Sequence, residues 1–267
     1  MVIRRSAVKN PNLSSLQIKI DTGVKASSRT VRRRLLTQFG LRAYRPAKKP
    51  HLNKLQRDKR IRFCKKYLHW NEDDWSKILF SDESMFCQFG TETSFVRRPP
   101  KTRYLRRYTV PTMKHPPKVM VWACFSSAGR GSLYFIEQGK TVNADEYIKI
   151  LKSKMKLSMQ IHRCSTFQQD SAPCHTSKKV KDWMIENGVQ VLEWPGNSPD
   201  LNPIENLWMV LKRKVRLCRP SNVQDLIYHI KRSWCLDITP ELCQKLVQSM
   251  PKRLKSVIES KGFATKY

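Results

Sequence analysis

The sequence has no long hydrophobic run. Its longest unbroken apolar stretch, Val119–Phe125, is far shorter than the roughly 20 residues that a membrane-spanning helix needs. The first residues, Met1 to Arg5, are not followed by the apolar segment of a secretory signal peptide. No lipidation motif accompanies the basic residues, which makes a membrane-surface protein the weaker alternative. We therefore expect no membrane partner.

The eight cysteines form no C-x-x-C pair. A zinc site built on cysteine needs closely spaced pairs, and scattered cysteines do not indicate a disulfide framework. We expect reduced thiols, partly buried, in an intracellular protein. The neighbours Cys174 and His175 are interpreted as structural, because no second pair completes a metal site.

Acidic residues are scarce and unevenly distributed. The chain has 21 Asp and Glu against 52 Lys and Arg, a net charge of +31. Residues 1–66 hold 20 basic and two acidic residues, and residues 97–118 hold eight basic residues and no acid. Because a polyanion would offset the repulsion within these two stretches, composition alone favours a nucleic acid partner.

Residues 14–21 have the pattern of a short helix. Ser14 or Ser15 can cap its start, and Leu16 and Ile20, four residues apart, are predicted to share its apolar face. A turn that contains Gly23 follows.

A second, more basic helix is predicted over Ser27–Phe39. The serine pair at its start can cap it, and Gly40 stands where a left-handed residue commonly ends a helix. Val31 and Leu35 point to one side, whereas the rest is crowded by Arg29, Thr30, Arg32, Arg33 and Arg34. Two helices joined by a turn, the second one basic, describe a helix-turn-helix whose second helix reads the major groove. A small helical bundle with a solvated basic face is the alternative that the pattern leaves open.

The segment Arg42–Arg60 is basic and contains two prolines. It could follow a phosphate backbone, act as a nuclear import signal, or simply connect two domains. The sequence does not choose between these roles.

From residue 75 the pattern changes to alternating strands and helices. Strands are predicted at 77–82, 119–125, 165–170 and 189–192, and helices at 143–158, 177–187 and 202–217. Such alternation indicates an α/β sheet covered by helices.

Two of these strands are predicted to end in an acid, and a third acid lies at the start of a helix. Asp82 and Asp170 are the last residues of the strands 77–82 and 165–170, and Glu205 lies near the start of the last helix. Converging carboxylates repel one another unless a cation lies between them. Mg²⁺ favours one or two carboxylates plus substrate phosphates, and two such ions can activate a nucleophile and stabilise a leaving oxygen. A basic protein with this cluster would cut or join nucleic acid.

Each acid also has a purely structural interpretation. Asp82 and Asp170 can begin turns, and Glu205 fits a capping box with Asn202 as N-cap and Pro203 as the first helical residue. Taken singly, each of these interpretations is favoured, because short motifs often match by chance.

Taken together, the surrounding residues resemble the catalytic blocks of Tc/mariner DNA transposases. The three blocks are Trp75–Phe86, Phe167–His175 and Trp194–Trp208. Residues 171–204, 34 in all, separate the second acid from the third, which is the spacing of the Tc branch. The similarity extends from the N-terminus to the last residues.

The resemblance implies a ribonuclease H-like α/β core, a mixed sheet flanked by helices, preceded by a small all-α helix-turn-helix domain. It implies that Asp82, Asp170 and Glu205 form a D-D-E triad that binds two Mg²⁺ or Mn²⁺ ions. In such a core the first acid sits on the first strand, the second on the fourth, and the Glu on a following helix. The domains expected are a DNA-binding domain at 1–42, a basic linker at 43–74 and the catalytic domain at 75–267.

The reaction implied is cut-and-paste transposition. Metal-activated water hydrolyses phosphodiester bonds at the terminal inverted repeats, and the freed 3′-hydroxyl attacks target DNA, commonly at TA. The partners implied are double-stranded DNA, as transposon ends and target, and a second copy of the chain in a homodimer on DNA. We expect a nuclear location and no small-molecule cofactor.

The resemblance also favours DNA binding by the basic helix, because Ser27–Leu35 matches the recognition helix of the family's second helix-turn-helix. The residues expected to contact DNA are Ser27, Ser28, Arg29, Thr30, Arg32, Arg33, Arg34, Lys48 and Lys49. The basic segment 97–118 falls where the family places an extended loop, and we expect it to act as a clamp that binds phosphates.

Two departures from the family pattern stand out. The family normally carries a first helix-turn-helix upstream, and this chain starts too late to contain it, so weak recognition of element ends is expected. The stretch Lys114–Val119 replaces a glycine-rich lead into a strand, with no loss of a catalytic acid.

Two other functions remain open at this stage. A transposon-derived DNA-binding protein without catalytic activity would bind DNA equally well without Glu205. A basic packaging protein would bind any polyanion with a steep salt dependence and no sequence preference.

Overall fold

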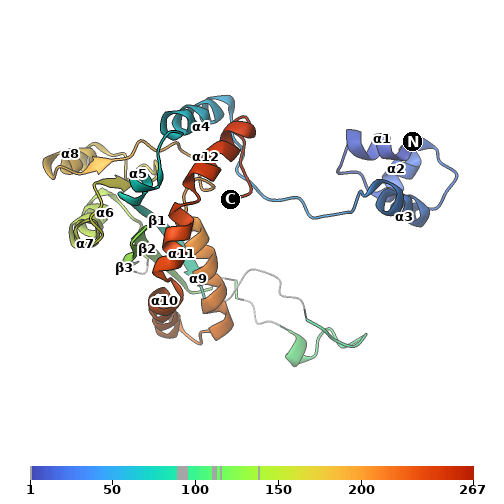
Figure 1. Ribbon diagram of the computed structural model, residues 1–267. Helices are drawn as coiled ribbons and strands as arrows, with labels where there is room; N and C mark the ends of the chain where they lie inside the picture. Colours follow the sequence, from blue (N-terminus) through green and yellow to red (C-terminus); the bar gives the residue numbers. More distant parts are fainter. Residues whose placement is uncertain (1, 89–95, 110–112, 115, 138) are drawn as a thin grey trace. The chain divides into compact units, whose positions relative to one another are not determined.

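The chain folds into two units, Met1–Lys49 and Pro50–Tyr267, in the computed structural model (Figure 1). The structure describes residues 2–88, 96–109, 113–114, 116–137 and 139–267. Within these ranges, no helix combines the length and the apolar character needed to cross a bilayer.

Three short helices form the N-terminal unit: α1 (Val2–Lys9), α2 (Ser15–Thr22) and α3 (Ser28–Phe39). Its core consists of four buried side chains, Ile3, Ile18, Val31 and Leu35. The predicted apolar face of α2 is wrong, since Leu16 and Ile20 are 55% and 63% exposed. Ile18 is buried instead, because α1 and α3 both pack against the side of α2 that carries it.

The ends of α2 and α3 lie where the sequence predicts them. The hydroxyl groups of Ser14 and Ser27 each accept a backbone N–H of the first turn. Gly23 and Gly40 end the two helices with φ of 64° and 65°, a left-handed conformation that glycine adopts without strain. The helix α1 was not predicted.

The structure differs from the predicted linker 43–74 after residue 53. α4 (Lys54–Tyr67) and α5 (Glu72–Ser76) occupy this stretch, and both belong to the second unit, which begins at Pro50 rather than at residue 75. Phe63 and Tyr67 of α4 are buried in the core of that unit. Lysines and arginines occupy most of the exposed face of α4. The prediction of a linker followed from this basic composition and overlooked the buried face of the helix.

Five strands form one mixed sheet in the order β3-β2-β1-β4-β5. They are β1 (Ile78–Cys87), β2 (Lys118–Ser126), β3 (Gly129–Ile136), β4 (Thr166–Gln168) and β5 (Gln190–Val191). β1, β2 and β3 are antiparallel neighbours, whereas β4 pairs in parallel with β1 and β5 in parallel with β4. β3, which follows β2 through a tight turn, was not predicted.

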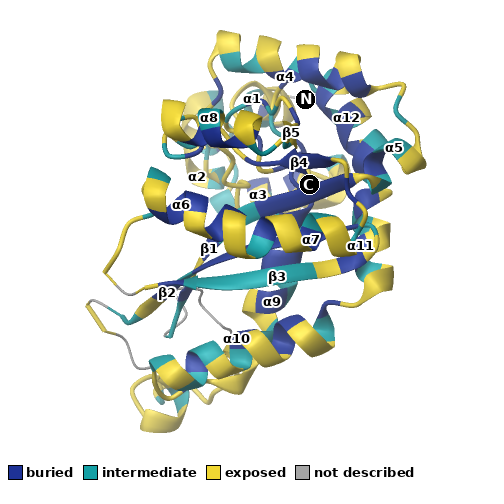
Figure 2. Ribbon diagram, turned by 90° about the vertical axis from the view of Figure 1, so that its left-hand side faces the viewer, coloured by how far each residue is buried: buried dark blue, intermediate teal, exposed yellow. Residues whose placement is uncertain are grey.

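Helices cover both faces of the sheet (Figure 2). One face is covered by α6 (Ala144–Ile150), the π-helical turn η2 (Leu151–Met155), α7 (Lys156–Ile161) and α8 (Lys178–Glu186). On the other lie α4, α5, α9 (Ile204–Cys218), α10 (Val223–Asp237), α11 (Pro240–Val247) and α12 (Met250–Glu259).

Alternate residues of the central strands enter the two cores. Leu79 and Trp122 are buried under α6–α8, whereas Phe80 and Val121 are buried under the opposite helices. This alternation follows from the two-residue period of a strand. With both faces covered, the sheet is the mixed, helix-flanked α/β arrangement that was predicted.

Candidate active site

The three predicted catalytic acids lie on three different elements of the second unit. Asp82 lies within β1, Asp170 two residues after β4, and Glu205 in the first turn of α9. The parallel pairing of β1 and β4 ends at Phe80 and Gln168, which are direct partners. Asp82 and Asp170 therefore each lie two residues beyond the pair Phe80–Gln168, on adjacent segments of the polypeptide.

Asp82 does not end its strand. β1 continues to Cys87 because it pairs with β2 up to that residue, whereas its pairing with β4 stops at Phe80. The prediction of a strand ending in an acid is therefore wrong for β1, and so is the interpretation of Asp82 as a turn residue. At Asp82, β1 is still paired with β2 on one side but is no longer paired with β4 on the other.

Hydrogen bonds beside the acids hold their three elements together. Ser81 donates from its N–H to Gln168 Oε1 at 3.2 Å and from its hydroxyl to the Gln168 carbonyl at 2.9 Å. Asn202 Nδ2 donates to the Ser81 carbonyl at 3.3 Å. Trp208 Nε1, in α9, donates to Asp82 Oδ2 at 3.1 Å. The residues next to the three acids are thus fixed to one another.

Asp82 and Glu205 are both difficult to ionise. Burial raises the pKa of Asp82 well above its usual value, and the charges of Glu205 and Glu83 raise it further, against the hydrogen bond from Trp208. Burial also raises the pKa of Glu205, and the opposing effect of Lys212 is smaller. A cation between these carboxylates would relieve both the desolvation and the repulsion.

Asp170 is electrostatically different. Its Oδ1 accepts hydrogen bonds from the Ala172 N–H at 2.9 Å and from His175 Nδ1 at 2.7 Å. Burial would raise the pKa of Asp170, but these bonds outweigh it and lower the pKa. The bond to Ala172 closes an Asx turn, so the turn interpretation of Asp170 is correct as a description of its local geometry.

His175, which was interpreted from the sequence as a structural residue, contacts the candidate site through Asp170. Its ring is buried against the ring of Tyr147, with centroids 3.9 Å apart, and its Nε2 lies 3.3 Å from Glu83 Oε1. Burial alone would lower the pKa of His175, but Asp170 and Glu83 raise it to about 10. The one sequence signal was its place five residues after Asp170, within the same block.

A buried ion pair holds the segment that leads into α9. The carboxylate of Asp200 accepts from Arg60 Nη1 and Nη2 at 2.8 and 2.7 Å, and from the N–H and hydroxyl of Thr265 at 2.8 and 3.0 Å. Arg253 donates to the Asp200 carbonyl at 2.9 Å and to Asn206 Oδ1 at 2.5 Å. We call these five residues the Asp200 node. Their hydrogen bonds fix the chain at Asp200 and at Asn206, which lie before and after Glu205.

The predicted capping box at the start of α9 is not formed. Pro203, rather than Asn202, is the N-cap residue, and it makes no side-chain cap bond. The Asn202 N–H donates to the Pro199 carbonyl, and its side-chain amide reaches Ser81. Among the hydrogen bonds of the described residues, none joins the Glu205 carboxylate to the Asn202 backbone, so the carboxylate is not used as a cap.

The acids suit a cation that is shared with a substrate. In the described part of the chain, no three His, Cys, Asp or Glu side chains lie close enough to enclose a metal ion by themselves. Mg²⁺ does not need such a cage, because it keeps water and binds substrate phosphates through one or two carboxylates. Asp82 and Glu205, whose pKa values are raised mainly by burial, fit this role.

Comparison with known proteins identifies the family. Residues 77–227 match a family described as DDE superfamily endonuclease, and residues 2–69 match one described as transposase. The Tc1 transposase of Caenorhabditis elegans is 39% identical over 273 residues, which cover 99% of this chain and 98% of that protein. The chain belongs to the Tc/mariner superfamily of DNA transposases. It is accordingly an enzyme of the DNA endonuclease and transposase class.

Other relatives agree with this transposase assignment. The Tcb2 transposase of Caenorhabditis briggsae is 40% identical over 99% of this chain and 98% of that protein. The Tc3 transposase of C. elegans is 30% identical over 98% of this chain and 78% of its own length.

Solved structures confirm the fold of the transposase. The Mos1 transposase in a paired-end complex with the left transposon end matches with a TM-score of 0.84 at 20% identity, covering 98% of this chain and 78% of that one. The Mos1 catalytic domain with raltegravir and Mn matches with a TM-score of 0.64 at 20% identity, covering 81% of this chain and all of that one. The mixed sheet with flanking helices is thus the ribonuclease H-like fold that the resemblance implied.

The predicted DNA-contacting residues of the transposase are mostly exposed. Val31 and Leu35 turn one side of α3 into the core, so its basic residues face outward. The exposed members of the predicted set are Ser27, Arg29, Arg32, Arg33, Arg34, Lys48 and Lys49. Ser28 and Thr30 are half-buried, and the Thr30 hydroxyl lies 3.0 Å from the N-cap hydroxyl of Ser27. DNA contact by these residues stays a prediction.

The predicted clamp segment 97–118 joins β1 to β2. Its described part contains one short 3₁₀ turn, η1 (Arg106–Tyr108), and most of its residues are exposed. Residues 110–112 and 115 of this prediction lie outside the described residues, and so does part of the stretch Lys114–Val119. Its role as a clamp stays a prediction.

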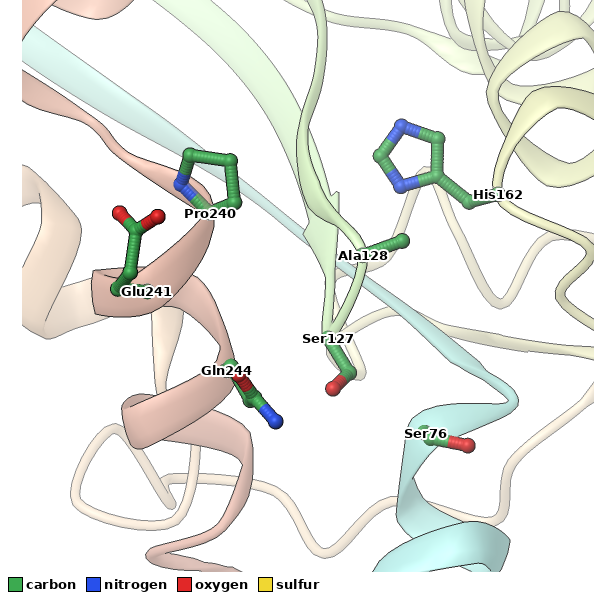
Figure 3. Close-up of a pocket in the computed structure, with 7 residues that line it drawn as sticks. All are labelled: Ser76, Ser127, Ala128, His162, Pro240, Glu241 and Gln244. Carbon is green, nitrogen blue, oxygen red and sulfur yellow. The ribbon is translucent and has the colours of Figure 1, made fainter.

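A separate open pocket of about 450 Å³ lies in the second unit (Figure 3). Its lining residues are Ser76, Ser127, Ala128, His162, Pro240, Glu241 and Gln244. Burial lowers the pKa of His162, whose Nδ1 lies 2.6 Å from the Ser126 hydroxyl. The pocket offers one imidazole and a single carboxylate, and none of the three predicted catalytic acids lines it.

Proposed function

We propose that this transposase cleaves DNA at terminal inverted repeats and joins the freed 3′-hydroxyl to target DNA, at TA sites. Asp82, Asp170 and Glu205 are the proposed catalytic acids. The observation that carries the proposal is their placement on adjacent elements held together through Ser81, where burial raises the pKa values of Asp82 and Glu205.

The proposed chemistry needs no nucleophilic side chain. Two bound Mg²⁺ or Mn²⁺ ions would supply activation of the attacking water or 3′-hydroxyl and stabilisation of the leaving oxygen. Asp82 and Glu205 provide partly or largely buried hard oxygen ligands, and Asp170 provides a third carboxylate across the β1–β4 edge. The titles of solved Mos1 structures name Mg and Mn, which supports divalent cations as the cofactor here.

Double-stranded DNA is the proposed partner, both as transposon ends and as target. The outward basic face of α3 and the basic segment after it suit a major groove and its phosphates. The Mos1 paired-end complex holds a transposon end, which supports the same class of partner for this chain.

We further propose a homodimer on DNA and a nuclear location. Cut-and-paste transposition must handle two ends of one element, and two copies of the chain would supply one active site for each. The nuclear location follows from the proposed substrate and from the basic segment 42–60.

Cleavage of supercoiled plasmid by the full chain tests this function. We expect nicking that requires Mg²⁺ or Mn²⁺, stops in EDTA and falls by at least about 10³-fold in Glu205→Ala. Glu193→Ala is the matched control, because Glu193 is an exposed carboxylate paired with Lys66. Equal activity of wild type and Glu205→Ala would contradict the proposal and indicate a contaminating nuclease. DNA binding without cleavage in either protein would favour the binding-only function.

A further inference from the structure

We propose that His175 is a positioning residue that determines which oxygen of Asp170 faces the cation. This inference rests on the proposed function, because it concerns the same carboxylates. It adds a histidine and its partner Glu83 to a site otherwise described by three acids.

The hydrogen bonds of Asp170 distinguish its two oxygens. Oδ1 accepts from the His175 ring at 2.7 Å and from the Ala172 N–H at 2.9 Å. A carboxylate oxygen has two lone pairs, so these donors occupy both. Among the hydrogen bonds of the described residues, Oδ2 accepts none, and the Asp170 side chain is 48% exposed. Oδ2 is therefore the oxygen left for a ligand.

The His175 ring is itself held on several sides. It is 3% exposed and lies nearly parallel to the ring of Tyr147, at an interplanar angle of 27°. The Tyr147 hydroxyl donates to Gln169 Oε1 at 2.8 Å, and Gln169 Nε2 donates to the His175 carbonyl at 3.4 Å. Ring rotation would break this packing, so the direction of the Nδ1 donor is fixed by the core.

The second ring nitrogen of His175 faces the other side of the site without a hydrogen bond of its own. Its Nε2 lies 3.3 Å from Glu83 Oε1, and Glu83 is the neighbour of Asp82 on β1. His175 thus lies between Asp170, in the segment after β4, and Glu83, on β1. Ligating groups in metal sites are commonly oriented by such outer partners, whose loss lowers metal affinity by about 10–100-fold.

A histidine that only fills space would behave differently. Its ring could be replaced by another flat ring without effect on Asp170, because an exposed carboxylate can be solvated by water. A positioning role instead depends on a donor at the Nδ1 position.

Three variants of the full chain separate these roles. His175→Asn places an amide nitrogen near the position of Nδ1 and keeps the donor to Asp170. His175→Gln, matched in polarity, places its amide near the position of Nε2, toward Glu83. His175→Phe keeps a flat ring and has no donor. Thermal unfolding in EDTA checks that each variant is folded.

Mn²⁺ binding is the primary readout, measured from the electron paramagnetic resonance signal of free Mn²⁺ titrated into each protein. Cleavage of supercoiled plasmid against Mn²⁺ concentration is the second readout. We expect a dissociation constant at least about 10-fold weaker for His175→Gln and His175→Phe, and within about 3-fold of wild type for His175→Asn. The half-saturating Mn²⁺ concentration in cleavage should shift in the same order.

Wild-type Mn²⁺ affinity in a folded His175→Phe protein would overturn the inference, and so would equal weakening in the Asn and Gln variants. A wild-type protein that binds no Mn²⁺ would overturn it as well. If wild type binds Mn²⁺ but does not cleave DNA, the proposed function fails, whereas the order of Mn²⁺ affinities among the variants still decides the role of His175.

Discussion

Asp82 and Asp200 are two carboxylates that flank the start of α9 and have opposite surroundings. Asp200 is 4% exposed, and although burial would raise its pKa, the bonds from Arg60 and Thr265 outweigh this and lower it. Burial raises the pKa of Asp82, and the charge of Glu205 raises it further. One carboxylate is fully paired within the chain, and the other lacks a positive partner.

The contrast is informative because positive charge is abundant, with 52 Lys and Arg in the sequence. Among the described residues, no salt bridge involves Asp82 or Glu205. Arg60, in contrast, is completely buried and forms a salt bridge with Asp200. A buried charge is stable only when it is paired. The pairing is therefore complete at Asp200, and no salt bridge forms at Asp82 and Glu205, where we propose that an external cation binds.

Asp82→Asn should break this contrast most strongly. We expect cleavage to fall by at least about 10³-fold, because a hard oxygen ligand is lost. In EDTA the same variant should be more stable than wild type by about 1 kcal/mol, or about 2–4 °C, because an unpaired buried carboxylate has been removed. Plasmid cleavage and thermal unfolding of the same preparations measure both effects. A lower melting temperature in EDTA would contradict the description of Asp82 as unpaired.

Asp200→Asn should affect stability instead. Removal of one partner leaves the Arg60 guanidinium buried without its counter-charge, which costs about 3–5 kcal/mol of unfolding free energy. Urea unfolding of the full chain, followed by tryptophan fluorescence, reports on the second unit. Asp182→Asn is the control, since Asp182 forms an exposed pair with Lys178 and its loss should change stability by less than about 1 kcal/mol. Equal effects of the two substitutions would show that the node contributes no more than a surface pair.

The pH dependence of stability should sharpen the contrast through its sign. Because the folded pKa of Asp200 is lowered, its contribution is complete above the unfolded value of about 3.9 and is lost as pH falls through the folded pKa. The stability difference between wild type and Asp200→Asn should therefore shrink as the pH falls from about 4 toward 2. Urea unfolding over this range measures it, and a difference that stays constant to pH 2 would exclude the ion pair as its source.

Thr265→Val should give the smallest effect. It removes the hydroxyl that donates to Asp200 at 3.0 Å and keeps the backbone N–H that donates at 2.8 Å. We expect a loss of about 1 kcal/mol or less, with cleavage retained. A loss as large as that of Asp200→Asn would mean that Thr265, rather than Arg60, dominates the node.

Local patterns in the sequence predicted much of the fold. The caps Ser14 and Ser27 and the helix ends Gly23 and Gly40 are readable because capping depends on residues a few positions apart. The strand β2 is readable because both of its faces are apolar. The three acids could be placed on elements of the correct type because each belongs to a recognisable block.

Features that depend on distant residues could not be read in this way. The pairing that carries β1 past Asp82 is made with β2, and the partner of His175 is Glu83, on a different strand. The Arg60–Asp200 pair joins residues 140 positions apart, and no local pattern marks Arg60 as buried among the basic residues of α4. Long-range pairing is decided by the tertiary fold, which local periodicity does not encode.

The Asp200 node can form only when synthesis of the chain is almost complete. Arg60 Nε donates to the carbonyl of Gly262, 202 residues later, and Thr265 completes the bonds of Asp200. A chain is synthesised from its N-terminus, so the first unit can fold long before these partners exist. A product that ends before residue 262 would contain α1–α3 but would lack the bonds that Gly262 and Thr265 make to Arg60 and Asp200. If α3 binds DNA as we propose, such a fragment would occupy DNA without cutting it and would compete with intact copies for the same sites.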